Sequence, residues 1–158
     1  MLAMLSDRRR IVGVDYDAEK IETARHSFLR RPETEFVHAD LRTAELPEAD
    51  AFLLLDVLHY MQPEEQRGLI ARCAARLKAG GRIIIRDGDA GKAERHKTTA
   101  MTEVWSTKIV GFNKTDGELY FTSTPELQQT ARRLGLEIHA AHTDAHTSNT
   151  VYILTRPE

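Results

Sequence analysis

Two aspartates stand where a carboxylate could bind a nucleoside. Asp15 closes the short apolar run at residues 11–14, and an acid at the end of such a strand can accept hydrogen bonds from both ribose hydroxyls. Asp40 follows a second short run and could accept a hydrogen bond from an adenine amino group. Each has a simpler alternative, because aspartate is also a common cap or turn residue. Asp17 is the better helix cap near Asp15, so we favour ribose binding there.

A further pair of polar residues follows the apolar run at residues 51–55. Asp56 lies at the mouth of this predicted strand, where burying an unpaired carboxylate is costly, so it needs a partner or a cationic ligand. His59 is the histidine that we nominate as a general base for a protonated nucleophile. The alternative for His59, which we favour on sequence alone, is a histidine at a helix start packed under Tyr60.

Alternating strands and helices are predicted to position these side chains. The first helix begins at Asp17 and is expected to end at Pro32, while the second begins at Pro63 and is expected to stop at Gly80 and Gly81. The run at residues 51–55 lacks polar alternation, which is typical of a strand covered on both faces. This order predicts an α/β domain with helices packed on a parallel sheet. The predicted strands of this part are residues 11–15, 36–37, 51–55 and 83–85.

The segment at residues 88–123 has the weakest pattern, although residues 93–105 allow one amphipathic helix. Aromatic side chains in this segment could line a pocket, with two polar side chains beside them. Trp105 could equally be a core residue of the helix. The pocket candidates are Trp105, Phe112, Tyr120 and Phe121, with His96 and Lys97.

The chain closes with one helix and two strands. A helix is predicted to start at Thr124 and to end at Gly135. Strands follow at residues 136–140 and 149–155, and the short connection between them has no room for a helix. These two strands are therefore predicted to pair antiparallel.

Taken in order, these motifs resemble a class I S-adenosylmethionine-dependent methyltransferase of the small-molecule type. The run at residues 12–17 resembles the family's second strand, whose terminal acid holds the cofactor ribose, and Tyr16 would lie along the adenine. Residues 39–41 resemble the adenine-contacting motif, and residues 55–59 resemble the fourth-strand motif. Residues 77–83 resemble the family's helix-to-fifth-strand signature, and the closing antiparallel pair matches the family's reversed strand.

The resemblance implies a fold, a cofactor and a reaction. The fold would be a Rossmann-like α/β sheet, mostly parallel, with an antiparallel C-terminal strand. The reaction would be an in-line methyl transfer from S-adenosylmethionine to an oxygen, nitrogen or carbon of a small-molecule acceptor, accelerated largely by positioning. The ammonium or sulfonium centre of the cofactor would be the cationic ligand of Asp56. The implied cofactor-binding residues are Asp15, Tyr16, Asp40, Leu41, Leu55 and Asp56, with His59 as the catalytic candidate.

Residues 1–10 depart from the family, because they contain no glycine. The family's first strand ends in a glycine-rich loop that wraps the methionine end of the cofactor. Residues 1–6 instead resemble the end of the helix that follows that loop. Residues 1–158 are therefore expected to be a single, partial methyltransferase domain, truncated at its N-terminus and lacking the central strand. Two strands would then have unpaired edges, which favours a homo-oligomer or a longer parent protein.

Composition narrows the function classes. The 158 residues are 41% hydrophobic and suit one globular domain, and the net charge of −2 gives no basic field for nucleic acid or an anionic membrane. No apolar run approaches the ~20 residues of a transmembrane helix. The single cysteine, Cys73, is read as a core residue; it excludes an intrachain disulfide and favours the cytoplasm.

Three other readings of the sequence are weighed against the methyltransferase. A fragment of an NAD-dependent oxidoreductase would share the acid after the second strand, but the closing antiparallel pair and the Asp56 motif speak against it. A non-catalytic remnant or interaction subunit is favoured by the missing glycine loop. A metal site at His139, His142 and His146 with Asp144 is disfavoured, because two of these histidines would point to opposite faces of a strand, so no metal is predicted.

Overall fold

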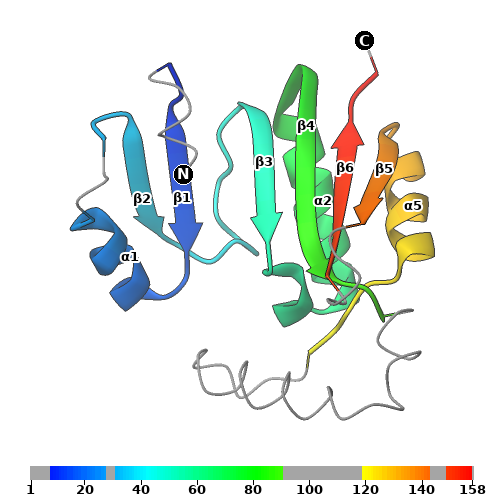
Figure 1. Cartoon of the computed structure of the whole chain (residues 1–158), viewed down its shortest axis with the longest axis horizontal. Helices are drawn as coiled ribbons and strands as arrows, with labels where there is room; N and C mark the ends of the chain where they lie inside the picture. Colours follow the sequence, from blue (N-terminus) through cyan, green and yellow to red (C-terminus); the bar gives the residue numbers. More distant parts are fainter. Residues whose placement is uncertain (1–7, 28–30, 91–118, 143–148, 158) are drawn as a thin grey trace. The chain divides into compact units, whose positions relative to one another are not determined.

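The computed structural model describes the parts of the chain that carry most of the predicted elements. The chain forms two compact units, residues 1–45 and residues 46–158, and each is described by itself. Within each unit, strands and helices alternate along the chain (Figure 1). The single domain over residues 1–158 stays a prediction. The described residues are 8–27, 31–90, 119–142 and 149–157.

The first unit is one strand–helix–strand element. It consists of β1 (Ile11–Asp15), α1 (Ala18–Arg25) and β2 (Thr34–His38). The two strands pair in parallel, so their carboxyl ends lie at the same edge of the sheet. Asp17 caps α1 as predicted: its Oδ1 accepts the backbone N–H of Glu19 at 2.9 Å.

Helix α1 is shorter than predicted. It ends at Arg25, so the prediction that it continues to Pro32 is wrong. The backbone N–H of His26 closes the last turn on Glu22 O at 3.1 Å, and the Arg25 guanidinium donates to Phe36 O at 2.9 Å. These bonds tie the end of α1 to β2 before the proline is reached. Phe28 and Leu29, expected on this helix, lie outside the described residues.

The second unit contains a four-stranded sheet in the order β3-β4-β6-β5. β3 pairs with β4 in parallel, and β6 runs antiparallel to both β4 and β5, as predicted for the closing strands. This mostly parallel sheet with one reversed C-terminal strand confirms the predicted fold class. The elements are β3 (Ala49–Leu55), the 3-10 helix η2 (Leu58–Tyr60), α2 (Pro63–Arg76), β4 (Leu77–Gly88), α5 (Thr124–Arg133), β5 (Glu137–His142) and β6 (Asn149–Thr155).

Two helices cover one face of this sheet. The inward side chains of β4 and β6 are fully buried, and so is the apolar stripe of α2, including Cys73 as predicted. Both helices begin where predicted, at Pro63 and Thr124. Among the described residues, no helix is long and apolar enough to cross a membrane. The buried core includes Leu54, Leu58, Leu69, Ile70, Cys73, Ile83, Ile85, Leu127, Ala131, Tyr152 and Leu154.

The end of α2 differs from the sequence prediction. The helix stops at Arg76, before the glycines, because Leu77 adopts an extended conformation and pairs with Ala49 at the start of the β3–β4 ladder. Gly80, at φ 68°, therefore lies within β4, where a residue without a Cβ tolerates a left-handed backbone. The prediction that Gly80 and Gly81 end the helix is wrong.

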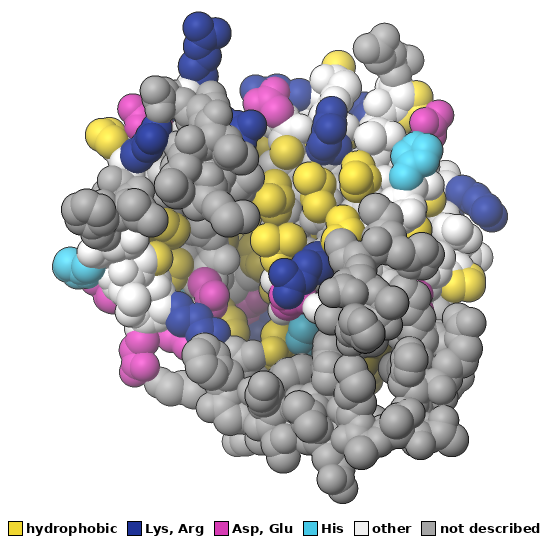
Figure 2. All heavy atoms as spheres, in the orientation of Figure 1, with side chains coloured by type: hydrophobic (Ala, Val, Ile, Leu, Met, Phe, Trp, Pro, Cys, Tyr) yellow, Lys and Arg dark blue, Asp and Glu magenta, His cyan; other side chains and the backbone are white. Residues whose placement is uncertain are grey.

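The opposite face of β3 is more open than predicted. Of the run at residues 51–55, only Leu54 is buried, while Leu53 is exposed and Leu55 is 50% exposed. Figure 2 shows hydrophobic side chains gathered over the strands on this face. In the described part of the chain, β1 pairs only with β2, and β3 pairs only with β4, so each has one edge without a ladder partner.

Candidate functional site

The first unit presents Asp15 and Tyr16 at the carboxyl end of β1. Asp15 is half-buried; its Oδ1 accepts the N–H of Asp17 at 2.9 Å, and no donor from the described residues reaches Oδ2. Tyr16 follows it with 47% of its surface exposed. The Nε2 of His38, on the neighbouring strand, lies 2.8 Å from Tyr16 O and holds this turn in place. This edge therefore offers a carboxylate oxygen and an exposed ring.

Asp40 lies close to the same edge but is engaged by a neighbour. The Ala39 N–H donates to Asp15 O at 3.0 Å, which brings the turn after β2 beside β1. The Arg42 guanidinium donates to both Asp40 oxygens: Nε lies 3.0 Å from Oδ1 and 2.9 Å from Oδ2, and Nη2 lies 2.7 Å from Oδ2. Leu41, between them, is half-buried. An adenine amino group would therefore compete with Arg42 for the Asp40 carboxylate.

Asp56 stands at the carboxyl end of β3 in the second unit. Among the described residues, Asp56 is the only residue other than glycine with a positive φ (54°), and asparagine and aspartate are among the few residues that tolerate it. The sequence predicted that Asp56 needs a partner or a cationic ligand. In the structure Arg86 is this partner, and its Nη2 lies 2.8 Å from Asp56 Oδ2. Burial raises the pKa of the Asp56 carboxyl, the Arg86 cation opposes this, and Asp87 adds to the rise.

His59 and Asp87 form a buried pair beside Asp56. His59 is 4% exposed and Asp87 6% exposed, and Nδ1 of the imidazole lies 2.6 Å from Asp87 Oδ1. The same carboxylate accepts the backbone N–H of His59 at 3.2 Å and that of Gly88 at 2.8 Å. Because a carboxylate at neutral pH only accepts, Nδ1 carries the proton in this pair. The lone pair of a neutral His59 imidazole is therefore on Nε2.

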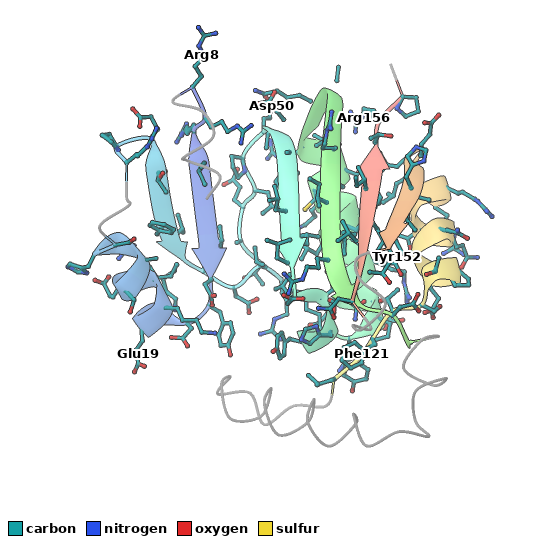
Figure 3. The ribbon with its side chains drawn as sticks, in the orientation of Figure 1. Arg8, Glu19, Asp50, Phe121, Tyr152 and Arg156 are labelled. Carbon is teal, nitrogen blue, oxygen red and sulfur yellow. The ribbon has the colours of Figure 1, made fainter. Side chains whose placement is uncertain are left out.

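Aromatic rings surround this imidazole. The Tyr60 ring lies 4.1 Å from it, centroid to centroid, at an interplanar angle of 49°, and the Phe121 ring stacks on it at 5.2 Å and 26°. His59 Nε2 is buried and has no hydrogen-bond partner among the described residues. A buried, unpaired nitrogen costs free energy in the folded state, so it calls for a functional explanation. Figure 3 places Phe121 at the end of the sheet to which β3 and β4 run.

The predicted site residues are thus divided between the two units. Asp15, Tyr16, Asp40 and Leu41 belong to the first unit, and Leu55, Asp56 and His59 to the second. Leu55 lies on the open face of β3, next to Asp56. The tight packing of His59 against Tyr60, which we favoured from sequence, is present, and it is accompanied by the pairing with Asp87.

Two charged residues of this cluster were not singled out in the sequence. Arg86 and Asp87 end the apolar strand that contains Ile83 to Ile85, just as Asp56 ends β3. Their position at the carboxyl end of a parallel neighbour was the signal that could have found them. Four of the six pocket candidates of residues 88–123 lie outside the described residues: His96, Lys97, Trp105 and Phe112.

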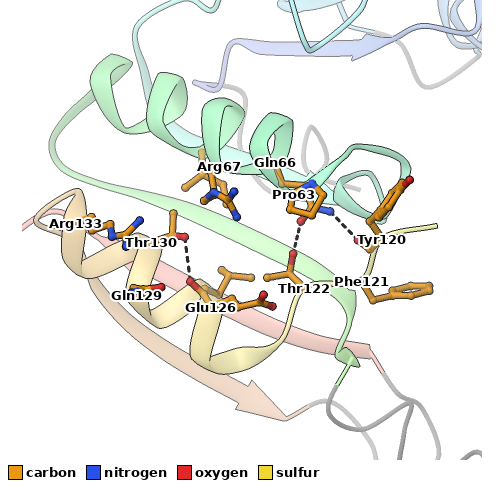
Figure 4. A pocket seen from close by; sticks show the side chains of 12 residues that line it. Pro63, Gln66, Arg67, Tyr120, Phe121, Thr122, Glu126, Gln129, Thr130 and Arg133 are labelled. Atoms are coloured by element: carbon orange, nitrogen blue, oxygen red, sulfur yellow. Dashed lines mark hydrogen bonds between the residues drawn. The ribbon is translucent and has the colours of Figure 1, made fainter. Parts of the chain in front are cut away.

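A groove of about 190 Å³ lies between α2 and α5 (Figure 4). Arg67 and Arg133 line its two sides, and the segment from Tyr120 to Thr122 closes one end. None of the predicted cofactor residues lines it. Among the described residues no cluster of histidine, cysteine and acidic side chains could hold a metal, and His146 and Asp144 of the weighed metal site lie outside them.

A family model described as "Methyltransferase domain" matches residues 1–81, which is more than half of the chain. The chain belongs to this methyltransferase family. The match confirms the resemblance to class I S-adenosylmethionine-dependent methyltransferases that the motifs carried. A comparison with curated proteins finds no match.

Solved structures share the fold across almost the whole chain. Human N-acetylserotonin methyltransferase in complex with SAM superposes with a TM-score of 0.70 at 18% identity, covering 99% of this chain and 43% of that one. The methyltransferase SibL superposes with a TM-score of 0.74 at 17% identity, covering 99% and 46%. An O-methyltransferase family protein from Burkholderia thailandensis is 28% identical, with a TM-score of 0.59, covering 78% and 36%. The chain thus spans less than half the length of these three structures.

Proposed function

We propose that the protein functions in methyl transfer from S-adenosylmethionine to a hydroxyl group of a small-molecule acceptor, with His59 as the general base. The observation that carries this proposal is the buried His59–Asp87 pair at the carboxyl ends of β3 and β4. In a chain of the methyltransferase family, this is the edge of the sheet where ligands of α/β folds bind. A base is needed when the nucleophile is protonated and weakly acidic, as a hydroxyl is.

The residues of the first unit fit the nucleoside part of the cofactor. Asp15 has a carboxylate oxygen without a donor from the described residues, and Tyr16 offers an exposed ring. We propose that Asp15 holds the ribose and that Tyr16 flanks the adenine. Asp40 and Leu41 would complete the adenine site when Arg42 releases the Asp40 carboxylate. When bound, the cofactor supplies a methyl group on a positively charged sulfur. Leu55 and Asp56 remain the residues proposed for the methionine part.

His59 can remove the acceptor's proton because Asp87 holds it in one orientation. Asp87 accepts from the backbone N–H of His59, which holds the carboxylate beside that residue, and from Nδ1, so the imidazole cannot rotate without breaking the Nδ1 bond. This fixes the neutral tautomer whose Nε2 is free to accept. The proton of the acceptor's hydroxyl would pass to Nε2, and the oxygen that it leaves behind takes the methyl group. Asp87 stabilises the imidazolium that results.

Binding of the product nucleoside tests this proposal. Titration calorimetry with S-adenosylhomocysteine should show binding to the whole chain, and NAD should give no response. Binding of NAD alone would favour the oxidoreductase alternative, and binding of neither would contradict both enzymatic functions for this chain. Formation of S-adenosylhomocysteine from S-adenosylmethionine with a panel of hydroxylated small molecules then tests turnover.

We also propose that the protein is cytoplasmic, has neither a nucleic-acid nor a membrane partner, and self-associates through the edges of β1 and β3. Cys73 is a buried free thiol, as suits a reducing compartment. Edge strands with unpaired N–H and C=O groups template pairing with another chain. Light scattering behind size-exclusion chromatography should give a mass above the 17.9 kDa of one chain. A monodisperse monomer that unfolds cooperatively would contradict the self-association.

A further inference from the structure

Gln66 is a buried polar residue on a helix face that is otherwise apolar. It is 2% exposed, and its neighbours on this face, such as Leu69 and Ile70, are core residues. A buried amide is costly unless its hydrogen bonds are made. Gln66 Nε2 donates to Met61 O at 2.9 Å and to Tyr120 O at 2.7 Å, and its Oε1 accepts from Thr122 Oγ1. Both ends of the amide are therefore used.

These bonds fasten one short segment to α2, which begins shortly after the 3-10 helix η2 that carries His59. Tyr120 and Thr122 are more than 50 residues away from Gln66 in sequence, and Figure 4 shows both bonds side by side. The Tyr120 N–H also donates to the His59 backbone carbonyl at 2.9 Å. Phe121 lies between the two fastened residues, and its ring stacks on the His59 imidazole. We call residues 120–122 the clamp segment.

We propose that Gln66 is a positioning residue that holds the clamp segment so that Phe121 forms one wall of the acceptor site, against the face of the His59 imidazole. The catalytic part of this proposal rests on the function proposed above, whereas the effect of Gln66 on the positions of Phe121 and His59 does not. Asp87 fixes the imidazole through Nδ1, and Phe121 covers one of its faces. An acceptor must then reach Nε2 past the Phe121 ring, so Gln66 acts on acceptor choice through Phe121 without touching the imidazole.

Chemical modification of histidine by diethyl pyrocarbonate tests the clamp in the whole chain. Gln66→Met keeps the length of the side chain but removes all three bonds, so His59 should be modified faster by at least about tenfold, because the covering segment opens more often. Mass spectrometry of the peptides reads each site separately. The exposed His26 and His139 should keep their rates, and the buried Cys73 thiol on the same helix should stay unreactive toward a disulfide reagent.

A second variant covers the case in which Gln66→Met does not fold. Thr122→Val removes one bond of the three and should raise the His59 rate by a smaller factor, again without exposing Cys73. An unchanged His59 rate in either folded variant would overturn the proposal. So would a rise of the His59 and Cys73 rates by the same factor, because that would report general loosening of α2 and not the release of the clamp segment.

A spectroscopic readout separates positioning from a structural role. The stacked Phe121 ring should shift the nuclear magnetic resonances of the His59 ring protons, and Phe121→Leu should remove that shift. Gln66→Met should reproduce the change, and the double variant should add nothing to it. Additive changes would show that Gln66 does not act through Phe121. Neither readout needs cofactor or acceptor. Failure to bind S-adenosylhomocysteine would therefore contradict the proposed function without contradicting the proposed action of Gln66 on His59 through Phe121.

Discussion

The two units present the same kind of edge but build it differently. In the first unit, carboxylates follow β1 and β2 and are held by near neighbours in sequence, Asp15 by Asp17 and Asp40 by Arg42, while remaining at least partly accessible. In the second unit, His59 lies on the 3-10 helix η2, is buried, and is held by Asp87 of strand β4. For the function proposed above, the first edge would bind the nucleoside and the second would take up the acceptor's proton.

Among the substitutions that compare the two units, removal of the proposed base His59 should have the largest effect. His59→Asn keeps a polar side chain that can donate to Asp87 but leaves no Nε2 to accept the acceptor's proton, so kcat should fall by roughly 10²–10⁴-fold. Binding of S-adenosylhomocysteine should stay unchanged, because the residues proposed to hold its nucleoside belong to the first unit. The measurement is the rate of S-adenosylhomocysteine formation with a hydroxylated acceptor. His139→Asn, an exposed histidine on β5, is the matched control and should keep full activity. An active His59→Asn variant would show that the acceptor needs no base.

Removing the partner of the base should cost mainly stability. Asp87→Ala leaves the imidazole and the backbone N–H groups of His59 and Gly88 buried without an acceptor, so the free energy of unfolding should fall by about 3 kcal/mol. In the other unit, Asp40→Ala breaks an exposed pair with Arg42 and should cost less than about 1 kcal/mol. Urea unfolding of both variants compares the two edges directly. Equal losses would mean that burial is not what distinguishes them.

What could be predicted from the sequence follows the same division. The alternation of elements, the cap at Asp17 and the antiparallel closing strands depend on neighbouring residues, and all were predictable. His59 was a candidate because it follows a strand closely. Its pairing with Asp87 was not predictable, because it joins residues 28 positions apart on different elements.

The same limit explains two other differences between the sequence predictions and the structure. Gly80 and Gly81 read as a helix stop, but strand pairing of Leu77 with Ala49 ends the helix first, and pairing partners cannot be seen locally. Phe121 was predicted to be an aromatic residue of a pocket, but its stacking on His59 could not be predicted. Gln66 carried no signal at all, because a glutamine on a helix is ordinary until its three partners are known.

Changing the first edge should alter binding without altering stability. Asp15→Asn replaces one acceptor oxygen by a donor, so a ribose would lose a hydrogen bond to a charged group, and the affinity for S-adenosylhomocysteine should fall roughly tenfold. Calorimetry measures the dissociation constant, and Glu19→Gln on the exposed side of α1 is the control. An Asp15→Asn variant with unchanged affinity would move the ribose away from this residue.

Substitution of Asp56, at the edge of the second unit, should have the smallest effect on stability. Its carboxyl is at the buried edge but remains partly exposed, and burial raises its pKa despite Arg86. A raised pKa means that the folded state binds the proton more tightly than the unfolded state. The stability that Asp56 contributes is therefore complete below its ordinary pKa of about 3.9 and is lost as the pH rises through the raised value.

Asp56→Asn should remove this dependence and keep the backbone, because asparagine tolerates the left-handed φ of 54°. Relative to the wild type, the variant should gain stability as the pH rises from about 4 to 7, by less than about 1 kcal/mol because the carboxyl is partly solvated. Urea unfolding at both pH values measures the difference. A difference that does not change with pH would mean that the Arg86 cation fully offsets the burial of Asp56.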